Sequence, residues 1–409
     1  MLSSVIAFGA NDSFSADRKV PAKLTAQFKT WLAKDLWPQA QANGISQNTF
    51  NKAFSKISLN LKLPGLTMPG EKPKVPKKQS QSEFGSPEKY FRPNVFNGVI
   101  AGGRQRLQKY KSTLSKIEKS TGVPGRIIVG IWGRESGFGR AKLPYNAIQV
   151  LGTKAFMSSR KKYFRSELIA ALKLIQANNI APTALMGSWA GALGQPQFMP
   201  SSYLNHARDF DGNGTPDIWK SVPDTLGSIA GYLQDKGWVR GRDWGFEVVL
   251  PSNVSCALEG PDSGRTISDW ANLGVKRVSG KPFPKNELKG EGYLMMPAGA
   301  YGPAFIVTPN FYVLKEYNKS DLYALFVGHG GDRMQFNSKP FSAKWGNVGG
   351  MYRSDIAAMQ RGLEKQGYDV GGADGLPGFK TRRSIGDWQQ KNGLKPTCFP
   401  QPNLIKRLK

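Results

Sequence analysis

The sequence predicts an α+β protein that is mainly α-helical. Apolar residues recur at three- and four-residue spacing through much of the chain before about residue 236, short β-rich runs separated by Gly and Pro follow at about 245–311, and residues 349–409 form a small helical unit. The 409 residues, of which 39% are hydrophobic, allow two to four globular domains. We therefore expect N-terminal helices, a long helical central region with a small β-rich insertion, and a C-terminal module of three helices.

The N-terminal region is expected to be helical at about 22–58. Its first segment reads KLTAQFKTWLAKDLWPQA, with apolar residues at helical spacing, and SQNTFNKAF begins a further helix with Ser46 as the N-cap. The prolines and lysines of PGLTMPGEKPKVPKKQSQSE indicate an extended connection. Residues 1–20 are read as a signal remnant or a disordered leader, because an apolar stretch is present but a basic start is not.

The central region carries most of the predicted elements. Helices are expected at 100–119, 125–136, 164–178, 184–193 and 222–236, and another near 317–327. The β-rich runs are GFEVVL, KRVSG, GYLMMPAG and AFIVTPNFYVL. No stretch is long and apolar enough to predict a transmembrane segment.

The charge and the metal-binding residue types exclude some functions. Lys and Arg number 57 and Asp and Glu 29, so the formal net charge is +28, which implies a polyanionic neighbour such as nucleic acid, an anionic envelope polymer or a membrane surface. No nucleic-acid-binding motif accompanies the charge. Two histidines exclude an HExxH helix. The two cysteines, Cys256 and Cys398, exclude a thiol metal cluster, and two unrelated thiols are the simpler interpretation over one disulfide.

Glu135 is the first candidate for catalysis. It ends the apolar run IVGIWGRE and is followed by SGFGR, whose glycines break a helix and let a ligand approach. Burial disfavours the charged form of a carboxyl group and should raise its pKa, which makes a proton donor at neutral pH. The alternative is a structural ion pair with Arg134 or Arg140.

A second stretch, at 186–219, is rich in small residues and polar side chains. It reads MGSWAGALGQPQFMPSSYLNHARDFDGNGTPDIW. Such a composition suits a groove for a hydroxyl-rich ligand, with Trp132, Trp189, Phe198 and Tyr203 as candidates for stacking on sugars. A closely packed helical hairpin is the alternative, since Gly and Ala also permit helix contact.

Together these motifs resemble the B-type family of lytic murein transglycosylases. GRESGFGR, MGSWAGALGQPQFMPSSY, DFDGNGTPDIW, LGSIAGYLQDKGW and PNFYVLKEYNKSDLYA occur in the order of that family, over about residues 22–345. The resemblance implies a lysozyme-like core and places the single catalytic acid at Glu135. In that family the acid protonates the glycosidic oxygen and then, as a base, activates the muramyl 6-hydroxyl, which leaves a 1,6-anhydro end.

The resemblance also implies a set of substrate-binding residues. Tyr90 is the match that rests on the fewest motifs, Asn318 is expected near the catalytic acid, and Lys161 stands where a second arginine can follow Arg160. The expected substrate-binding residues are Ser188, Gln197, Tyr232, Tyr317, Asn318, Tyr323, Arg160 and Tyr90.

A candidate calcium loop lies in DFDGNGTPDIWK. It begins like an EF-hand, but Lys220 occupies the position of the closing glutamate, so a standard EF-hand is excluded. The resemblance implies a variant loop that a later acid closes, and an Asx-rich turn without metal is the open alternative. The candidate oxygen ligands are Asp209, Asp211, Asn213, Thr215, Asp217 and Asp224.

The C-terminal unit resembles the peptidoglycan-binding type 1 domain. The matching residues are Gln360, Leu363, Gly367, Tyr368, Asp374, Gly375, Gly378, Thr381, Ile385, Trp388, Gln389, Gly393 and Leu394. Such a module raises the local concentration of an enzyme on its polymer. The expected domains are therefore a leader at 1–20, a catalytic region at 21–345 with its β-rich part at about 245–311, and a peptidoglycan-binding domain at 346–409.

The sequence thus predicts a peptidoglycan lytic transglycosylase, a carbon–oxygen lyase of the periplasm or bacterial cell envelope. Its expected partner is the glycan strand of peptidoglycan rather than nucleic acid, and it requires no cofactor for catalysis, a structural calcium ion aside. A muramidase that uses water and a non-catalytic wall-binding protein are the alternatives, and a nucleic-acid-binding protein rests on the charge alone. Protein partners are not predicted.

Overall fold

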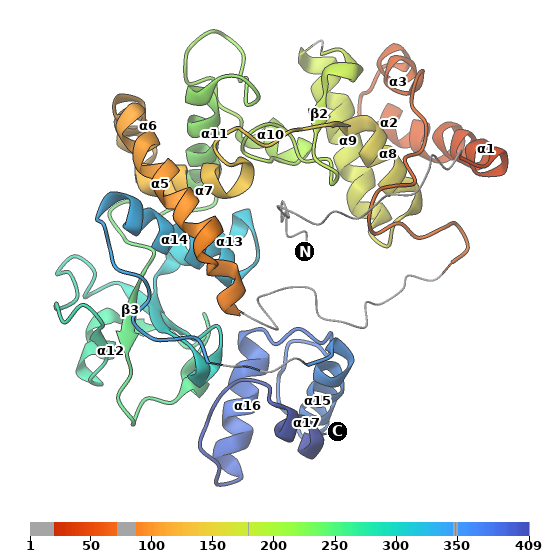
Figure 1. Ribbon diagram of the computed structural model, residues 1–409. Helices are drawn as coiled ribbons and strands as arrows, with labels where there is room; N and C mark the ends of the chain where they lie inside the picture. Colours follow the sequence, from red (N-terminus) through yellow and green to blue (C-terminus); the bar gives the residue numbers. More distant parts are fainter. Residues whose placement is uncertain (1–19, 72–86, 179, 347, 349–350, 409) are drawn as a thin grey trace. The chain divides into compact units, whose positions relative to one another are not determined.

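The computed structural model describes residues 20–71, 87–178, 180–346, 348 and 351–408 (Figure 1). Among the described residues, contacts define two compact units, one within 87–130 and 233–408 and the other within 20–71 and 131–232. The predicted leader lies outside the described residues except for its last position. Among the helices that are described, none has the length and apolar character that crossing a membrane requires. The predicted α+β, mainly α fold is confirmed, with helices far exceeding strands.

The unit around 131–232 is helical. Its centre is α8 (Ala147–Met157), in which every residue but Gln149 is buried, and α8 packs along α9 (Lys161–Asn178). A helix that is apolar on all sides must be covered on all sides. It also contains η3 (Pro182–Ala184), α10 (Pro200–His206) and the short strands β1 (Tyr145–Asn146) and β2 (Met186–Gly187), which pair antiparallel.

The N-terminal helices belong to the same unit. They are α1 (Ala22–Trp31), a π-helical turn η1 (Leu32–Leu36), α2 (Trp37–Ala42) and α3 (Gln47–Phe54). Phe28 and Trp31 pack on Phe156 of α8, with ring centroids 5.4 and 5.5 Å away. Ser46 caps α3 as expected, because its hydroxyl accepts a hydrogen bond from the N–H of Thr49.

The other unit begins with η2 (Pro87–Phe91), α5 (Pro93–Lys109) and α6 (Lys111–Thr121), and later adds α13 (Pro309–Tyr317) and α14 (Asp321–Gln335). α5 packs on α14. Gly330 allows this approach, since a Cβ there would lie 3.2 Å from the Phe96 ring. Two further helices continue from one unit into the other, α7 (Gly125–Ser136) and α11 (Val222–Asp235).

A five-stranded antiparallel sheet forms the β-rich insertion, in the order β4-β6-β7-β3-β5. Its core contains Phe246, Trp270, Leu294 and Ile306. The strands are β3 (Gly245–Val249), β4 (Arg265–Thr266), β5 (Lys276–Arg277), β6 (Glu291–Met295) and β7 (Ala304–Val307), and the short helices between them are η4 (Cys256–Leu258), α12 (Ile267–Asn272) and η5 (Gly299–Tyr301).

The C-terminal module has its own core and the three expected helices, α15 (Arg353–Lys365), α16 (Phe379–Lys391) and α17 (Pro402–Leu408). Gln360 is fully buried, and its side-chain oxygen accepts a hydrogen bond from the N–H of Gly375 at 2.7 Å. Gly375 has φ +77°, and a Cβ there would overlap the carbonyl oxygen of Arg353. The turn therefore requires glycine.

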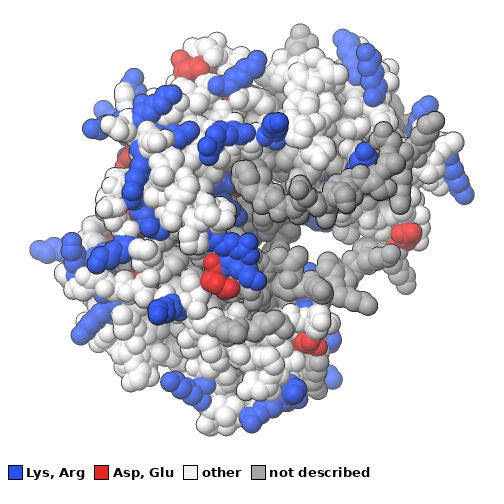
Figure 2. Space-filling view, in the orientation of Figure 1, with Lys and Arg blue, Asp and Glu red and all other residues white. Residues whose placement is uncertain are grey.

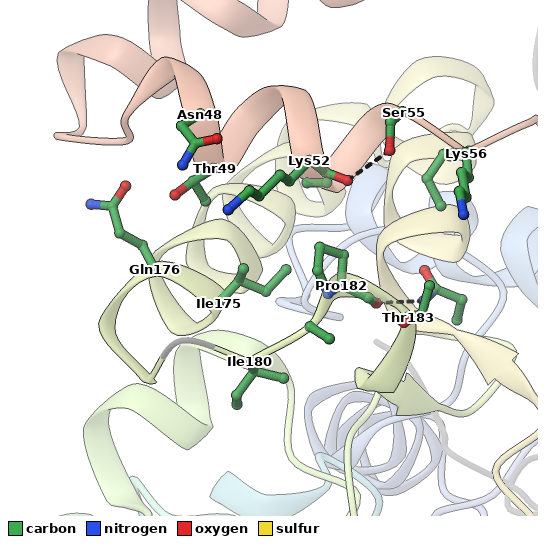
Figure 3. A pocket seen from close by; sticks show the side chains of 14 residues that line it. Asn48, Thr49, Lys52, Ser55, Lys56, Ile175, Gln176, Ile180, Pro182 and Thr183 are labelled. Atoms are coloured by element: carbon green, nitrogen blue, oxygen red, sulfur yellow. Dashed lines mark hydrogen bonds between the residues drawn. The ribbon is translucent and has the colours of Figure 1, made fainter.

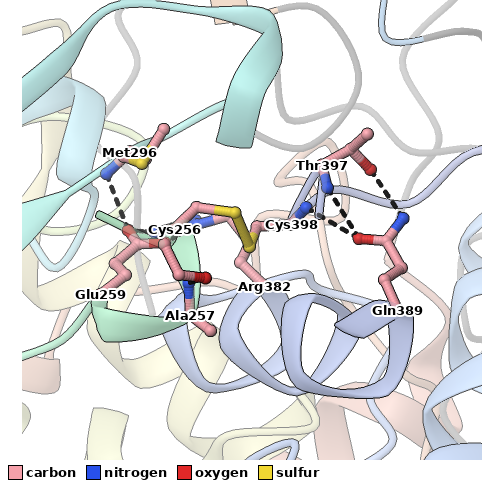
Figure 4. Close-up of a disulfide and its surroundings, with 9 residues drawn as sticks. Cys256, Ala257, Glu259, Met296, Arg382, Gln389, Thr397 and Cys398 are labelled. Carbon is pink, nitrogen blue, oxygen red and sulfur yellow. Dashed lines mark hydrogen bonds and ion pairs between the residues drawn. A yellow bond between two sulfur atoms is a disulfide. The ribbon is translucent and has the colours of Figure 1, made fainter. Parts of the chain in front are cut away.

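The interpretation of Cys256 and Cys398 as unrelated thiols is wrong. They form a disulfide that joins η4 of the β-rich insertion to the module across 142 residues (Figure 4). Both side chains belong to the core of the sheet, and so part of the module completes that core. Sequence separation alone did not reveal this pairing.

Three predicted helices differ from the structure. The helix expected at 100–119 is interrupted at Tyr110, where α5 ends and α6 begins. Residues 184–193 form the end of η3, strand β2 and tight turns, because Gly187 and Gly191 lie against backbone and side chains that a regular helix would not admit. The helix expected at 317–327 begins later, at Asp321, because α13 ends at Tyr317 and Ser320 caps α14. In the last β-rich run, Pro309 starts α13, so only its first part is a strand.

Candidate functional site

Glu135 lies in the last turn of α7 and is 2% exposed. The chain leaves the helix through Gly137, Phe138 and Gly139, all with positive φ. Ser136 closes this turn, since its hydroxyl accepts a hydrogen bond from the N–H of Gly139 at 3.0 Å. The burial predicted from the apolar run is thus observed, and the local backbone strain is of the kind that clusters at functional sites.

A tight hairpin turn presents Gln197. Leu193 and Phe198 exchange two backbone hydrogen bonds of 2.6 and 3.0 Å around GQPQ, and Gln197 adopts the left-handed region at φ 57°. The amide nitrogen of Gln197 donates to the carbonyl of Gly194, whereas its buried Oε1 atom has no hydrogen-bond partner in the described part of the chain. A buried, unsatisfied acceptor on a strained residue is costly and points to a ligand.

Gln195 connects this turn to the helix that carries Glu135. The indole N–H of Trp132, one turn before Glu135 in α7, donates to Gln195 Oε1 at 2.8 Å. The amide nitrogen of Gln195 donates to the carbonyl of Trp219, whose own indole N–H donates to the carbonyl of Met186. Sequence reasoning missed Gln195 and Trp219, although the usual need of a buried indole N–H for a partner was an available signal.

Ser188 and Tyr232 lie on the same unit. Ser188 follows β2 and begins a tight turn, in which its hydroxyl accepts a hydrogen bond from the N–H of Ala192 at 3.2 Å. Tyr232 lies near the end of α11, with its ring 5.6 Å from that of Phe198 and 4.8 Å from His206. The ring contact with Phe198 joins Tyr232 to the turn that carries Gln197.

Arg160 lies before α9 with its guanidinium 4.2 Å above the Tyr163 ring. Its buried Nη1 atom has no hydrogen-bond partner among the described residues. Nearby, Lys154 is 3% exposed, donates to the carbonyl of Pro64 at 2.7 Å and faces the ring of Trp189 at 5.0 Å. Burial and the charge of Arg160 lower the pKa of Lys154 to about 8. Lys154 was not predicted.

The predicted sugar-stacking role does not fit three of the four aromatic residues. Trp132, Phe198 and Tyr203 are 2%, 2% and 5% exposed, so they are core side chains, while Trp189 keeps part of its surface. The Tyr203 hydroxyl donates to the carbonyl of Pro216. The small residues around them serve tight turns rather than the helical hairpin that was the alternative.

Tyr317, Asn318 and Tyr323 meet at the corner between α13 and α14, in the other unit. The rings of Tyr317 and Tyr323 stack with centroids 6.4 Å apart. Asn318 Oδ1 accepts a hydrogen bond from the N–H of Ser320, and the Ser320 hydroxyl accepts one from the N–H of Tyr323, both at 3.2 Å. The three predicted residues therefore share one hydrogen-bonded corner.

Tyr90 occupies a different setting. It lies in η2, with its ring 6.0 Å from Phe326 and 5.9 Å from Phe91. Phe91 in turn stacks on Trp345. These contacts place Tyr90 in an aromatic cluster against α14.

The candidate calcium loop brings together three of its six predicted ligands. One carboxylate oxygen each of Asp209, Asp211 and Asp224 lies within 4.8 Å of the others. Asp224 is fully buried and accepts three backbone hydrogen bonds from the loop. Asp217 instead accepts from the N–H groups of 219 and 220. Hard oxygen donors at this spacing fit Ca²⁺, and Asn213 and Thr215 contribute to the loop through the bond from the Thr215 N–H to Asn213 Oδ1.

A separate cavity of about 460 Å³ lies between α3, the end of α9 and η3 (Figure 3). Lys52 and Lys56 project from α3 and the turn after it along the edge of the cavity. Gln176 accepts a hydrogen bond from the N–H of Ser46 through its Oε1 atom and donates one to the carbonyl of Gly44 through its Nε2 atom. None of the predicted site residues lines this cavity. Elsewhere the face in Figure 2 carries many more basic than acidic side chains, in agreement with the charge of +28.

Two family models match the chain. Residues 27–332 match the transglycosylase SLT domain, and residues 352–408 match a putative peptidoglycan binding domain. The chain is 33% identical over 242 residues to membrane-bound lytic murein transglycosylase B of Escherichia coli K12. That alignment covers 59% of this chain and 64% of the relative, so it spans less than two thirds of the relative's length.

Solved structures of similar proteins extend the match. SltB3 of Pseudomonas aeruginosa, in complex with NAG-anhNAM-pentapeptide, has a TM-score of 0.82 and 33% identity, over 93% of this chain and 99% of that one. The Escherichia coli lytic transglycosylase Slt35 in complex with calcium has a TM-score of 0.57 and 26% identity, over 76% of this chain and 93% of that one. Slt35 has also been solved with bulgecin A, at a TM-score of 0.56.

Proposed function

This chain belongs to the transglycosylase SLT domain family, and on that premise we propose that it is a peptidoglycan lytic transglycosylase. It cleaves the β-1,4 bond between N-acetylmuramic acid and N-acetylglucosamine and leaves a 1,6-anhydro end. The observation that carries the proposal is Glu135, a carboxyl group 2% exposed at the end of an apolar helix. The relative solved with NAG-anhNAM-pentapeptide, which contains such an anhydro sugar, supports this product.

Glu135 acts first as an acid and then as a base. Burial favours the neutral form of a carboxyl group, which is the form that can donate a proton to the glycosidic oxygen. As the bond from C1 to that oxygen breaks, Glu135 becomes a carboxylate, which then takes the proton of the muramyl 6-hydroxyl while O6 bonds to C1. The proton is thereby restored and no water is consumed. Intramolecular attack benefits from the high effective concentration of the 6-hydroxyl.

Other side chains bind the glycan in this proposal. Gln197 offers an unsatisfied buried Oε1 atom, which suits a sugar hydroxyl or amide N–H. Arg160 offers an unsatisfied Nη1 atom, which suits the lactyl or peptide carboxylate. The substrate-binding set is completed by Ser188, Tyr232, Tyr317, Asn318, Tyr323 and Tyr90.

The C-terminal module is proposed to hold the enzyme on the wall. Its match to a putative peptidoglycan binding domain at residues 352–408 supports this role, with domain boundaries at 21–345 and 346–409. The enzyme would then act in the periplasm or bacterial cell envelope, where its polymer is. Glycan strands are the proposed partner.

A calcium ion is proposed as a structural ligand of the loop at 209–224. Asp209, Asp211 and Asp224 would hold it, and its charge would offset their mutual repulsion. The relative that was solved in complex with calcium supports the assignment. The proton chemistry of Glu135 does not involve the ion, and catalysis needs no other cofactor.

Mass spectrometry of the soluble products from purified sacculi tests the function. The wild type should release muropeptides with 1,6-anhydro ends, and Glu135→Gln should lower the rate by about 10²-fold or more, because the proton donor is lost. Glu167→Gln is the matched control, since Glu167 is also buried in the same unit but bonds Ser201. It should keep most of the activity.

Each other outcome has a definite meaning. Products one water heavier, with reducing ends, would replace the lyase assignment with a hydrolytic muramidase. A Glu135→Gln protein that clears sacculi at the rate of the wild type would refute the catalytic assignment. Binding of sacculi without any release by the wild type would leave a non-catalytic wall-binding protein.

A further inference from the structure

Arg382 of the C-terminal module is a buried cation whose partners lie in the catalytic region. It stands in the first turn of α16 and is 1% exposed. Its guanidinium makes a bidentate ion pair with Glu259, with Nε–Oε2 and Nη2–Oε1 distances of 2.9 and 2.5 Å. Nη2 also lies 3.1 Å from Oδ2 of Asp321. Figure 4 shows Arg382 beside Glu259 and the disulfide.

The receiving side of this contact is equally enclosed. Glu259 is fully buried, three residues after Cys256, and accepts a hydrogen bond from the N–H of Met296 at 3.0 Å. Asp321 is 8% exposed and its other oxygen lies 2.6 Å from Nζ of Lys315. Burial raises the pKa of Asp321, but Lys315 and Arg382 outweigh it and hold this pKa at about 2. Lys315 and Arg382 therefore keep Asp321 in its charged form.

Asp321 is the first residue of α14, at the corner that carries the predicted glycan-binding residues. Lys315 in α13 and Asp321 in α14 pair across the break between these helices. At this break, Ser320 forms hydrogen bonds with both Asn318 and Tyr323. Asp321 starts the helix that carries Tyr323, and its pair with Lys315 links that start to α13, which ends at Tyr317.

From this arrangement we infer that Arg382 is a positioning residue for glycan binding by the catalytic region. Arg382 holds Asp321 in place, and Asp321 in turn positions the corner of Tyr317, Asn318 and Tyr323. The bidentate pair with Glu259 fixes the orientation of the Arg382 guanidinium. The module then has a second role besides attachment to the wall, because it supplies a part of the catalytic region's binding geometry. A buried ion pair adds little net stability, so specifying one geometry is a role that suits it. The inference rests on the proposed function.

The test compares steady-state kinetics on soluble, uncrosslinked glycan strands for variants of the full chain. Arg382→Met combined with Glu259→Gln removes the cation and one acid together, so that Asp321 keeps Lys315 and no charge is left buried alone. Arg383→Met is the matched control. Arg383 is the next residue, and it pairs with Asp262, also between the module and the β-rich insertion.

The double variant should raise KM by about three- to tenfold with a much smaller change in kcat, as expected for residues coupled through one network. Arg383→Met should leave both constants near the wild-type values. Arg382→Lys keeps the positive charge but loses the bidentate geometry of the guanidinium. Its KM should therefore lie between those of the wild type and the double variant. A thermal melt of each protein establishes that it is folded at the assay temperature.

Two results would overturn the inference. One is a folded double variant with the KM of the wild type, and the other is an equal rise in KM for Arg383→Met, which would indicate general loosening of the module. If the double variant does not fold, Asp321→Asn replaces it in the test, because this change keeps the Arg382–Glu259 pair. The inference then requires that Asp321→Asn raises KM, and a KM equal to that of the wild type refutes it.

Failure of the proposed function is recognised separately. A chain that does not cleave glycan gives no kinetics, but the affinity for soluble strands is measurable in Glu135→Gln proteins with and without the double change. The same three- to tenfold loss of affinity, roughly, is expected there.

Discussion

Cys256 and Cys398 are joined by a disulfide although 142 residues separate them. The bond sits in the core of the five-stranded sheet, and its module side is held by Gln389, whose Oε1 accepts hydrogen bonds from the N–H groups of Thr397 and Cys398. The catalytic region and the module are thus one covalent and hydrophobic assembly at this point.

Replacing both cysteines with serine should lower the free energy of unfolding by about 2–5 kcal/mol, because closing so long a loop restricts the unfolded chain. Denaturant unfolding of the oxidised wild type and the double variant measures the difference. The wild type treated with a reductant should match the variant. Coincident curves for oxidised and reduced wild type would contradict the prediction.

Gly139→Ala should destabilise the protein beyond the usual cost of its backbone conformation. A Cβ at Gly139 would overlap the Gln195 side chain, which cannot move without losing its hydrogen bonds to Trp132 and Trp219. Gly44→Ala is the control, since Gly44 has almost the same φ, +80° against +79°, with nothing within 4 Å. Thermal denaturation should show an additional loss of about 1–3 kcal/mol for Gly139→Ala. Equal losses would refute the role of Gln195.

The stability of the wild type should rise with pH between about pH 7 and 9.5, relative to Lys154→Met. The pKa of Lys154 is about 8 in the folded protein, against 10.5 for an exposed lysine. In this window the unfolded chain therefore binds more protons than the folded one, and raising the pH favours folding. The gain should approach roughly 2 kcal/mol. Denaturation curves across the window measure it, and parallel pH dependences for the two proteins would contradict it.

Calcium should raise the melting temperature of the wild type relative to the same protein in a chelator. A ligand at about 100 times its dissociation constant stabilises by about 2.7 kcal/mol. Asp211→Asn should lose most of this shift, because Asp211 offers one of the three clustered carboxylates while the buried Asp224 still holds the loop. Magnesium is the control ion. A calcium shift that survives in Asp211→Asn would remove this loop as the site.

Much of the site is visible in the sequence because its signals are local. An apolar helix that ends in Glu135 and glycines predicts a buried carboxyl group without any knowledge of the rest of the fold. The sequence also indicates the residues of the corner, Tyr317, Asn318 and Tyr323, although its periodicity predicts one continuous helix there. Ser320 followed by Asp321 is an available capping signal for the break.

The missed residues depend on contacts between segments distant in the chain. Gln195 matters because Trp132 and Trp219 meet it, and Lys154 matters because burial beside Pro64 and Trp189 changes its pKa. The same holds for the helix predicted at 184–193. Glycine is compatible with a turn as well as with a helix, and the atoms packed around Gly187 and Gly191 decide for the turn.

By itself the sequence determined the helical periodicity, the β-rich insertion, the three-helix module and the buried Glu135, since each follows from patterns within a few turns of chain. Only the tertiary structure decided that Cys256 pairs with Cys398 and that Arg382 lies against Glu259 and Asp321. The sequence shows which side chains could form an ion pair or a disulfide. Which ones meet depends on how the packed elements bring distant parts of the chain together, and local patterns carry no information about that.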